Sequence, residues 1–415
     1  MSMKNLSLIS ACLLLGACGS TPAPLDSGLA APSQWRYLAA GRSDASDIRQ
    51  WWKAFGAPEL DSLLQRALLN SQDLGAAVAR VRQAQASAVI AGAPLLPELN
   101  ATLGASRQKL LRDSGYSGTD ATSDNDAVDS FSAGLSASYE VDFWGGRRAA
   151  YRSALESLKA SEYDRATVEL TLLSGVANSY LQVLALREQQ RIARLNLDNA
   201  EHVLRLVETR HAAGSATALE VAQQSSLVAS QRKQLPLLEQ QAHEALITLA
   251  TLIGEPVQAL QVAERPFDSL RSFRNPYYNL GANLLAPIFN HGRLRAERDR
   301  SLARQEELLE TYRKAILTAF ADTERSLNSI DGLDRQLHWQ QQELEQAQRA
   351  FDLSDSRYQA GAETLLTVLE TQRTLYAAQD AAVQLRLARL QASVGLYKAL
   401  GGGWQSDRQG LARKD

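Results

Sequence analysis

Few side chains in this sequence are grouped as a catalytic or metal site requires. The five histidines are scattered without the spacing of metal ligands; they are His202, His211, His243, His291 and His338. The glycine run 401–403 follows no strand, which indicates a helix stop and not a phosphate-binding loop. Carboxylates are spread along helix faces, and no nucleophile lies in a pattern with a base. The sequence therefore predicts no enzyme, no cofactor and no metal, and argues against a lipoprotein hydrolase.

The N-terminus carries the one chemical signal that is specific. Lys4 precedes the apolar run 6–15, which is too short to span a bilayer and ends in Leu15-Gly16-Ala17-Cys18. That ending resembles the lipobox of bacterial lipoproteins, which implies cleavage after residue 17 and acylation of Cys18. Gly19 stands where such proteins place Asp for retention in the inner membrane, which favours the outer membrane. The alternative is an ordinary secretory signal that contains this tetrapeptide by chance.

Charge and cysteine content exclude other classes. The chain has 44 basic and 46 acidic side chains, so it offers no electrostatic footprint for nucleic acid. Its two cysteines are Cys12 and Cys18. Cleavage would remove the first and acylation would occupy the second, so we expect no disulfide within the mature chain.

The sequence is duplicated. Residues 210–221 match residues 357–368 at an offset of 147, and residues 143–147 match residues 289–293 at an offset of 146. Two landmarks with nearly equal spacing indicate two large repeats. We assign a signal peptide (1–17), an acylated linker (18–57), repeat one (58–255), repeat two (256–404) and a tail (405–415).

Each repeat contains a very long predicted helix. The stretches 147–213 and 293–360 lack proline and are rich in good helix formers, and each would extend roughly 100 Å. Both end in an Ala-Gly pair that predicts a turn, after which shorter helices return over 216–254 and 363–400. Pro236 predicts a kink in the first of these. Helices this long must lie side by side in a coiled coil or a tube.

Period-two alternation predicts strands near the start of each long helix. Residues 131–143 alternate apolar and polar side chains, as do residues 99–106, and a third apolar series runs from Tyr278 to Ile288. Such strands suit a membrane barrel, with the polar stretch 112–129 as an exposed loop. The alternative is half-buried strands of a soluble sheet. The predicted fold class is mainly α, with long helical hairpins and a small membrane β-barrel part.

These landmarks together resemble the outer-membrane factor family, the TolC-like and NodT-like efflux lipoproteins. The resemblance covers most of the mature chain and rests on residues 51–60, 142–147, 275–281, 286–289 and 396–404. It implies a homotrimer in which each protomer gives four strands to one membrane barrel and its helices to one periplasmic α-barrel. It also implies a periplasmic adaptor protein that docks on the helical tips and an inner-membrane transporter that supplies the energy.

Repeat two departs from that pattern because it is short. Phe143 lies 85 positions after Pro58 in repeat one, whereas Phe289 lies only 33 positions after Pro256 in repeat two. Roughly fifty residues, equivalent to a helix and a strand, have no counterpart. Three strands per protomer would leave an odd count in the trimer, which closes a membrane barrel poorly.

The tip of the second hairpin is where the resemblance places a gate. It assigns closing contacts to Tyr358, Leu366 and Glu370; a leucine ring excludes water and a ring of acids favours cations. The alternative is that Leu366 belongs to the core and that Glu370 is an ordinary surface residue. The adaptor-docking tips would be Gly214 and Ser215 in the first hairpin, with Gly361 and Ala362 in the second.

The sequence thus predicts a passive trimeric duct of a tripartite efflux or type I secretion system, anchored in the outer membrane by lipid. Two alternatives stay open. One is a non-conducting, lipid-anchored coiled-coil scaffold. The other is an internally deleted and impaired outer-membrane factor.

Overall fold

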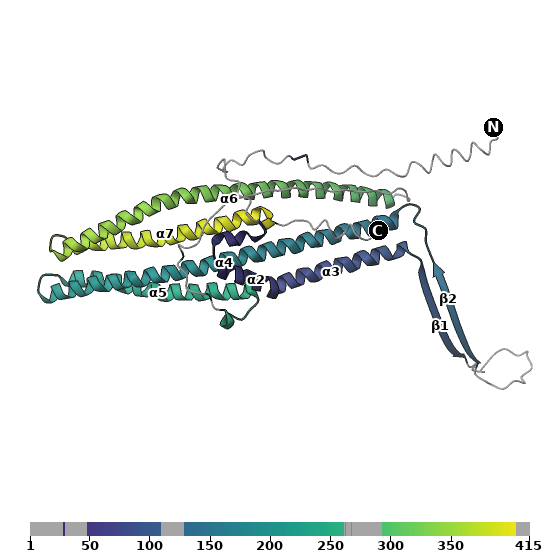
Figure 1. The fold of residues 1–415 in the computed structure, drawn as a ribbon, viewed down its shortest axis with the longest axis horizontal. Helices are drawn as coiled ribbons and strands as arrows, with labels where there is room; N and C mark the ends of the chain where they lie inside the picture. Colours follow the sequence, from purple (N-terminus) through teal and green to yellow (C-terminus); the bar gives the residue numbers. More distant parts are fainter. Residues whose placement is uncertain are drawn as a thin grey trace, which may run out of the picture. The chain divides into compact units, whose positions relative to one another are not determined.

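The computed structural model describes residues 28–29, 48–108, 128–260, 262, 267 and 293–403. Helices dominate this part of the chain (Figure 1). In chain order the helices and strands are α2 (Pro58–Asn70), α3 (Gln72–Gly92), β1 (Glu98–Gln108), β2 (Val128–Ser138), α4 (Gly146–Ala212), α5 (Ala218–Ile253), α6 (Arg293–Gln359) and α7 (Leu365–Ala399). Short 3-10 segments are η2 (Ile48–Phe55), η3 (Ala93–Leu95), η4 (Val257–Ala259) and η6 (Gly401–Gly403).

The predicted long helices and their returning partners are present. Both α4 and α6 have 67 residues. The ends of α6 and α7 lie 146 or 147 positions after the corresponding ends of α4 and α5. Helix α5 runs through Pro236 without interruption, although that residue contributes no N–H donor. No helix among the described residues combines the length and the apolarity that a bilayer crossing demands.

The chain divides into two compact units. One contains β1, β2, the end of α3 from Arg80 and the start of α4 up to Glu162; it also takes in residues 293–298 of α6. The other contains η2, α2, the start of α3 and the remainder of the long helical hairpins.

The first unit holds an antiparallel hairpin of β1 and β2. Its register pairs Leu103 with Ala133 and Ala101 with Leu135, so the apolar residues gather on one face. On the other face, the hydroxyls of Ser106 and Ser130 are 2.7 Å apart. Leu103 is 89% exposed, so this protomer alone does not cover the apolar face.

The strand predicted over residues 131–143 is wrong at its end. Strand β2 stops at Ser138, whose partner is Glu98, the first residue of β1. Before Glu98 the chain is already turning through η3, so residues 139–143 have no strand to pair with. Instead Asp142 accepts a hydrogen bond from the backbone N–H of Arg148 (2.9 Å) near the start of α4. The third predicted strand, 278–288, lies outside the described residues.

A coiled-coil seam joins α4, α5, α6 and α7 within the second unit. Buried residues of α4 recur at alternating steps of three and four: Ala193, Asn196, Ala200, Val203 and Val207. Val203 and Val207 form, with α5, α6 and α7, a cluster that includes Leu227, Phe351 and Tyr376. The two hairpins therefore lie side by side within this unit, with their turns at the same end (Figure 1).

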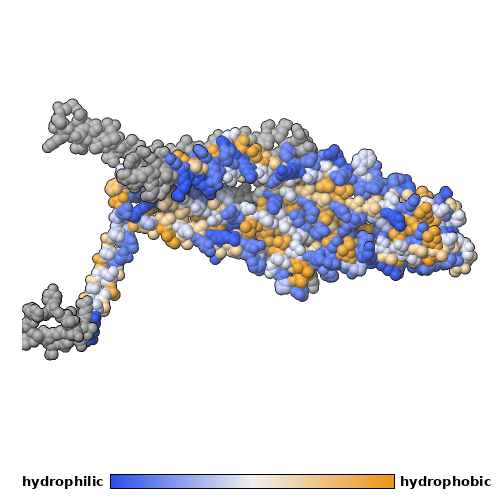
Figure 2. Space-filling model, turned by 180° about the vertical axis from the view of Figure 1, so that it is seen from behind, coloured by the Kyte–Doolittle hydropathy of each residue, from blue (hydrophilic) through white to orange (hydrophobic). Residues whose placement is uncertain are grey.

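The largest core lies at the opposite end of those hairpins. Trp51 and Phe55 of η2 and Leu64 of α2 are at most 2% exposed and pack against α4, α5 and α7. Trp51 stacks on Tyr397 of α7, with ring centroids 5.3 Å apart. Trp51, Trp52, Phe55 and Ala57, which the sequence assigned to a linker, are therefore part of the core. Elsewhere apolar side chains remain exposed between polar ones over the helices (Figure 2).

Replacing Trp51 should test whether η2 is structural. We expect Trp51→Ala to lower the free energy of unfolding by about 3–5 kcal/mol, because a large buried ring leaves a cavity. The matched control is Trp339→Ala, whose side chain is 66% exposed and whose loss should cost within about 0.5 kcal/mol. Urea unfolding of the detergent-solubilised proteins, followed by far-UV circular dichroism, measures both. Equal effects would mean that η2 adds nothing to stability.

Candidate gate and docking tips

Each helical hairpin reverses through the same hydrogen-bonded turn. In the first, the N–H of Ser215 donates to the carbonyl of Arg210 (2.8 Å) and the N–H of Gly214 donates to that of His211 (2.9 Å). In the second, Ala362 and Gly361 donate to Arg357 and Tyr358 in the same pattern. This is the Schellman arrangement, which requires a left-handed residue. Gly214 and Gly361 supply it, with φ of 73° and 76°.

A threonine then starts each returning helix. The Thr217 hydroxyl accepts from the N–H of Glu220, and the Glu220 carboxylate accepts from the N–H of Thr217 (2.6 Å), which completes a capping box. Thr364 caps α7 through the N–H of Thr367. The predicted docking residues Gly214, Ser215, Gly361 and Ala362 are all exposed on these turns.

The three predicted gate residues do not share one surface in the protomer. Leu366 is 58% exposed, and Glu370 lies exposed one turn further along the same face of α7. Tyr358, by contrast, is 2% exposed and belongs to the core between the hairpins. The structure therefore brings Leu366 and Glu370 together and separates Tyr358 from both.

Tyr358 is covered by an arginine of the other hairpin. The guanidinium of Arg210 lies over the Tyr358 ring, 4.4 Å from its centroid, and donates to the carbonyl of Gln359 (3.4 Å). A cation over an aromatic face contributes about 0.5–1 kcal/mol where solvent has access. Arg210 thus links the tip of the first hairpin to the tip of the second.

Arg357, the counterpart of Arg210 in the second repeat, has different partners. It lies 3.4 Å from the carboxylate of Glu363 in its own turn and donates to the carbonyl of Ala362. The N–H of Thr364 and the hydroxyl of Thr367, with a smaller effect of Arg357, hold the pKa of Glu363 below its ordinary value. At the position equivalent to Glu363, the first hairpin has Ala216. Arg210 therefore lacks this acidic partner in its own turn and contacts its neighbour.

Two residues of the tips escaped sequence reasoning although a signal existed. Leu219 is the duplicate of Leu366 at the offset of 147 and is 66% exposed. Arg210 is the duplicate of Arg357, and the exchange of Glu363 for Ala216 indicated that its partner would change. The offset of 147 thus leads from the gate candidate Leu366 to Leu219, and from Arg357 to Arg210.

The interior between the hairpins also contains polar groups. Tyr376 donates from its hydroxyl to the backbone carbonyl of Asn196 (2.8 Å), and burial raises the pKa of Tyr376. Gln224 is fully buried and donates to the carbonyl of Ala200 (2.8 Å). Such groups bond well in one packing arrangement only, because a buried polar atom without a partner is costly.

Comparison with known proteins agrees with this architecture. The sequence model of the outer membrane efflux protein family matches residues 63–255 and 259–402. The chain is 87% identical over 474 positions to the pyoverdine export outer membrane protein OpmQ of Pseudomonas aeruginosa, covering 100% of both chains. It is 51% identical over 463 positions to the protein of the same name from Pseudomonas putida, covering 97% and 98% of the two chains.

Solved structures show the same fold. The open state of the MtrE outer membrane channel of Neisseria gonorrhoeae gives a TM-score of 0.77 at 23% identity, covering 93% of this chain and 98% of MtrE. The outer membrane protein VceC of Vibrio cholerae gives 0.73 at 23% identity, covering 87% of this chain and 100% of VceC. The chain belongs to the outer membrane efflux protein family. It is an outer-membrane channel component of an efflux system, and family members are transport components.

The comparisons also describe a difference in length. The alignment with the P. aeruginosa relative has 474 positions and this chain has 415 residues, so at least 59 positions have no residue here. The two family matches cover 193 residues (63–255) and 144 residues (259–402), so the second is the shorter.

The left-handed conformation of Gly361 can be tested by substitution. We expect Gly361→Ala to lower the free energy of unfolding by about 1–2 kcal/mol, because the left-handed conformation is costly for residues with a Cβ atom. The control is Gly332→Ala, inside α6, where a Cβ atom meets nothing within 4 Å. That change should stabilise the helix by about 1 kcal/mol. Thermal unfolding measures both, and two shifts of the same sign would contradict the assignment.

Proposed function

We propose that this chain is a passive duct through which a siderophore of the pyoverdine type leaves the cell. The observation that carries the substrate class is the relative named for pyoverdine export, which is 87% identical and covers the whole of both chains. A second relative of that name is 51% identical. Within the described part of the chain, no cluster of His, Cys, Asp and Glu could hold a metal ion.

The duct would be a homotrimer. Large apolar side chains stay exposed along the hairpins of one protomer, among them Leu195, Leu219 and Leu353 at 49–66%. Apolar patches of this kind mark surfaces that another protein covers. Three protomers around an axis would bury such surfaces and enclose a passage between the long helices.

The gate would lie at the tip of the second hairpin. Leu366 and Glu370 are exposed on one face, so three copies around the axis would present a ring of leucines and a ring of carboxylates. The leucines would exclude water, and the carboxylates would favour cations at the mouth. Buried Tyr358 has a different role: with Arg210 it would hold the second tip against the first in the closed state.

The turns themselves would form the docking surface for the adaptor. Gly214, Ser215, Gly361 and Ala362 are exposed and small, so a partner could approach the backbone closely. The partners are a periplasmic adaptor protein and, behind it, an inner-membrane transporter that supplies the energy. Acylation at Cys18 would anchor the N-terminus in the outer membrane.

A specific observation supports the second candidate, a lipid-anchored scaffold that docks the adaptor without conducting. At least 59 positions of the P. aeruginosa relative have no residue here, and the second family match is the shorter one. The hairpins and their tips are complete, so a loss at the membrane end would leave adaptor docking intact.

Export decides between the two candidates. The chain is expressed in a pyoverdine producer that lacks its own outer-membrane component, with the 87% identical relative as the control. We expect pyoverdine fluorescence to move from the periplasm to the medium, as it does with the relative. Periplasmic retention, despite outer-membrane localisation and co-purification with the adaptor, would overturn the duct and leave the scaffold.

The gate has a matched control in the first hairpin. We expect Leu366→Ser with Glu370→Ala to raise the basal single-channel conductance in a planar bilayer several-fold, because both rings would be removed. The control is Leu219→Ser with Gln223→Ala, the exposed residues at the equivalent positions of α5. Its conductance should stay near the unmodified value. No change in the first variant, or an equal change in both, would remove the gate assignment.

A further inference from the structure

The apolar face of the β1–β2 hairpin ends in an ion pair. Along β1, this face carries Leu99, Ala101, Leu103 and Ala105. Arg107 follows at the next position of the same series, and the register places it opposite Asp129, one step beyond the pair of Ala105 with Phe131. Because side chains alternate between the two faces of a strand, the guanidinium of Arg107 lies on the face of the apolar residues.

Arg107 is exposed and keeps its hydrogen-bond donors. Its side chain is 73% exposed, and its Nε lies 3.6 Å from a carboxylate oxygen of Asp129, which is too far for a hydrogen bond. No other described residue accepts a hydrogen bond from it. A guanidinium has five N–H donors in a planar fork that matches two oxygens of a phosphate group. Arg107 can therefore donate to a group outside the described part of the protomer.

The arginines at the opposite end of the hairpin have acceptors within the chain. Arg147 donates to the carbonyl of Pro94 (2.9 Å) and to the carboxylate of Glu140. Arg148 donates to the carbonyl of Asp142 (2.8 Å). The two ends of the hairpin therefore differ in what their arginines leave for a ligand.

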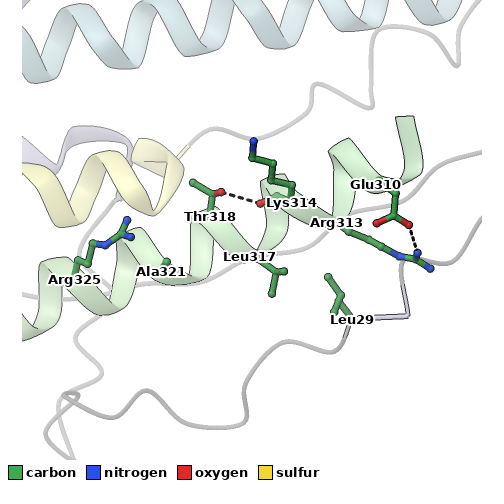
Figure 3. Close-up of a pocket in the computed structure, with 8 residues that line it drawn as sticks. All are labelled: Leu29, Glu310, Arg313, Lys314, Leu317, Thr318, Ala321 and Arg325. Carbon is green, nitrogen blue, oxygen red and sulfur yellow. Dashed lines mark hydrogen bonds and ion pairs between the residues drawn. The ribbon is translucent and has the colours of Figure 1, made fainter. Parts of the chain in front are cut away.

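Arginines on the long helix α6 also find acceptors nearby. Arg304 donates to Glu307 (2.6 Å), and Arg313 donates to Glu310 (2.5 Å), the second pair being drawn in Figure 3. In both pairs the partners are three residues apart, on neighbouring turns of the helix. A strand offers no such neighbour, so Arg107 has Asp129 beside it at a longer distance.

The position of Arg107 corresponds to the edge of an apolar membrane band. Leu99 and Arg107 are eight residues apart, which is about 27 Å along a strand. A barrel strand tilts by about 35–45°, so this length crosses about 20 Å of the membrane, close to an apolar band of about 25 Å. An arginine at this edge can extend its charged group into the interface while its stem stays beside the apolar residues.

Arg107 lies at the end of the hairpin that is remote from the helices. Glu98 begins β1 directly after η3, and its partner Ser138 ends β2 just before α4, so the helices join the hairpin there (Figure 1). The next step rests on the proposed function, in which the helices extend into the periplasm towards the adaptor. The end that carries Arg107 then meets the outer leaflet of the outer membrane.

We propose that Arg107 binds a phosphate group of the outer-leaflet lipid, namely a phosphate of the lipid A part of lipopolysaccharide. The guanidinium fork would donate to two phosphate oxygens, while Ala105 and Phe131 would contact the acyl chains next to it. Asp129 is the competing anion, which lies beside the guanidinium when no lipid is bound. The contact would fix the depth of the hairpin in the membrane.

Retention of lipid tests this contact. The full chain is purified from outer membranes in a mild detergent, and the lipid A that stays bound is counted per chain by mass spectrometry. We expect Arg107→Gln to lower the retained lipid A at least several-fold. Arg107→Lys keeps the charge but loses the planar fork, so it should retain an intermediate amount. Circular dichroism checks that each variant is folded.

Two matched variants separate the lipid contact from the ion pair. Ser106→Arg with Arg107→Ser keeps the net charge but moves the guanidinium to the polar face, so it should lose as much lipid A as Arg107→Gln. Asp129→Asn removes the competing anion and should retain at least as much as the unmodified chain. Equal retention by the unmodified chain and the exchanged variant would overturn the proposal. Loss of retention in Asp129→Asn would also overturn it, because Arg107 would then act as a partner of the ion pair.

Adding lipid back identifies the source of the phosphate. Delipidated protein is mixed with lipid A, phosphatidylglycerol or inorganic phosphate, and its thermal unfolding is measured. We expect lipid A to raise the unfolding temperature of the unmodified chain and not that of Arg107→Gln. An equal effect of phosphatidylglycerol would assign any anionic lipid, and an equal effect of inorganic phosphate would assign a dissolved anion; either would overturn the proposal. None of these measurements uses export, so their failure is distinct from failure of the duct.

Discussion

The arrangement of this chain depends on two left-handed glycines. A helix of 67 residues cannot bury its apolar stripe unless the chain returns along it, and the return begins at Gly214 and at Gly361. The Schellman hydrogen bonds end each long helix, and a threonine cap starts the next within a few residues. Because both turns are equal and the helices have matching lengths, the two hairpins reach the same level and can pack along one seam.

The packing between the two hairpins buries the most side chains at the end away from the turns. Trp51 and Phe55 join the helices of both repeats in one core, with Trp51 stacked on Tyr397 near the C-terminal end of α7. A chain segment that precedes the repeats thus holds them together. Towards the tips the interior becomes more polar, with Gln224, Gln372 and Tyr376 buried between the hairpins. Buried polar groups favour one packing arrangement, because each is costly when its partner is lost.

The two repeats are equal in their hairpins and unequal before them. In repeat one, α2 contributes Leu60, Leu63 and Leu64 to the main core. The corresponding cluster on α6 among the described residues is a small one of Leu327, Ile330, Leu396 and Leu400. The asymmetry extends to the tips, where Arg357 bonds within its own turn and Arg210 crosses to Tyr358. A duplicated sequence therefore gives a protomer with two similar turns whose equivalent arginines have different partners.

The sequence by itself determined the elements of this protein whose causes are local. Helix propensity and the absence of proline defined the long helices, Ala-Gly pairs defined their ends, and alternation defined β1 and most of β2. Tertiary structure decided where pairing and burial depend on distant residues. Strand β2 ends at Ser138 because β1 begins at Glu98. Trp51 is core because Tyr397, 346 positions later, offers its ring. Tyr358 is buried while Leu366 is exposed because Arg210 and the first hairpin cover only one of them. Such outcomes are set by which surfaces meet in space, and no local pattern of residues encodes that.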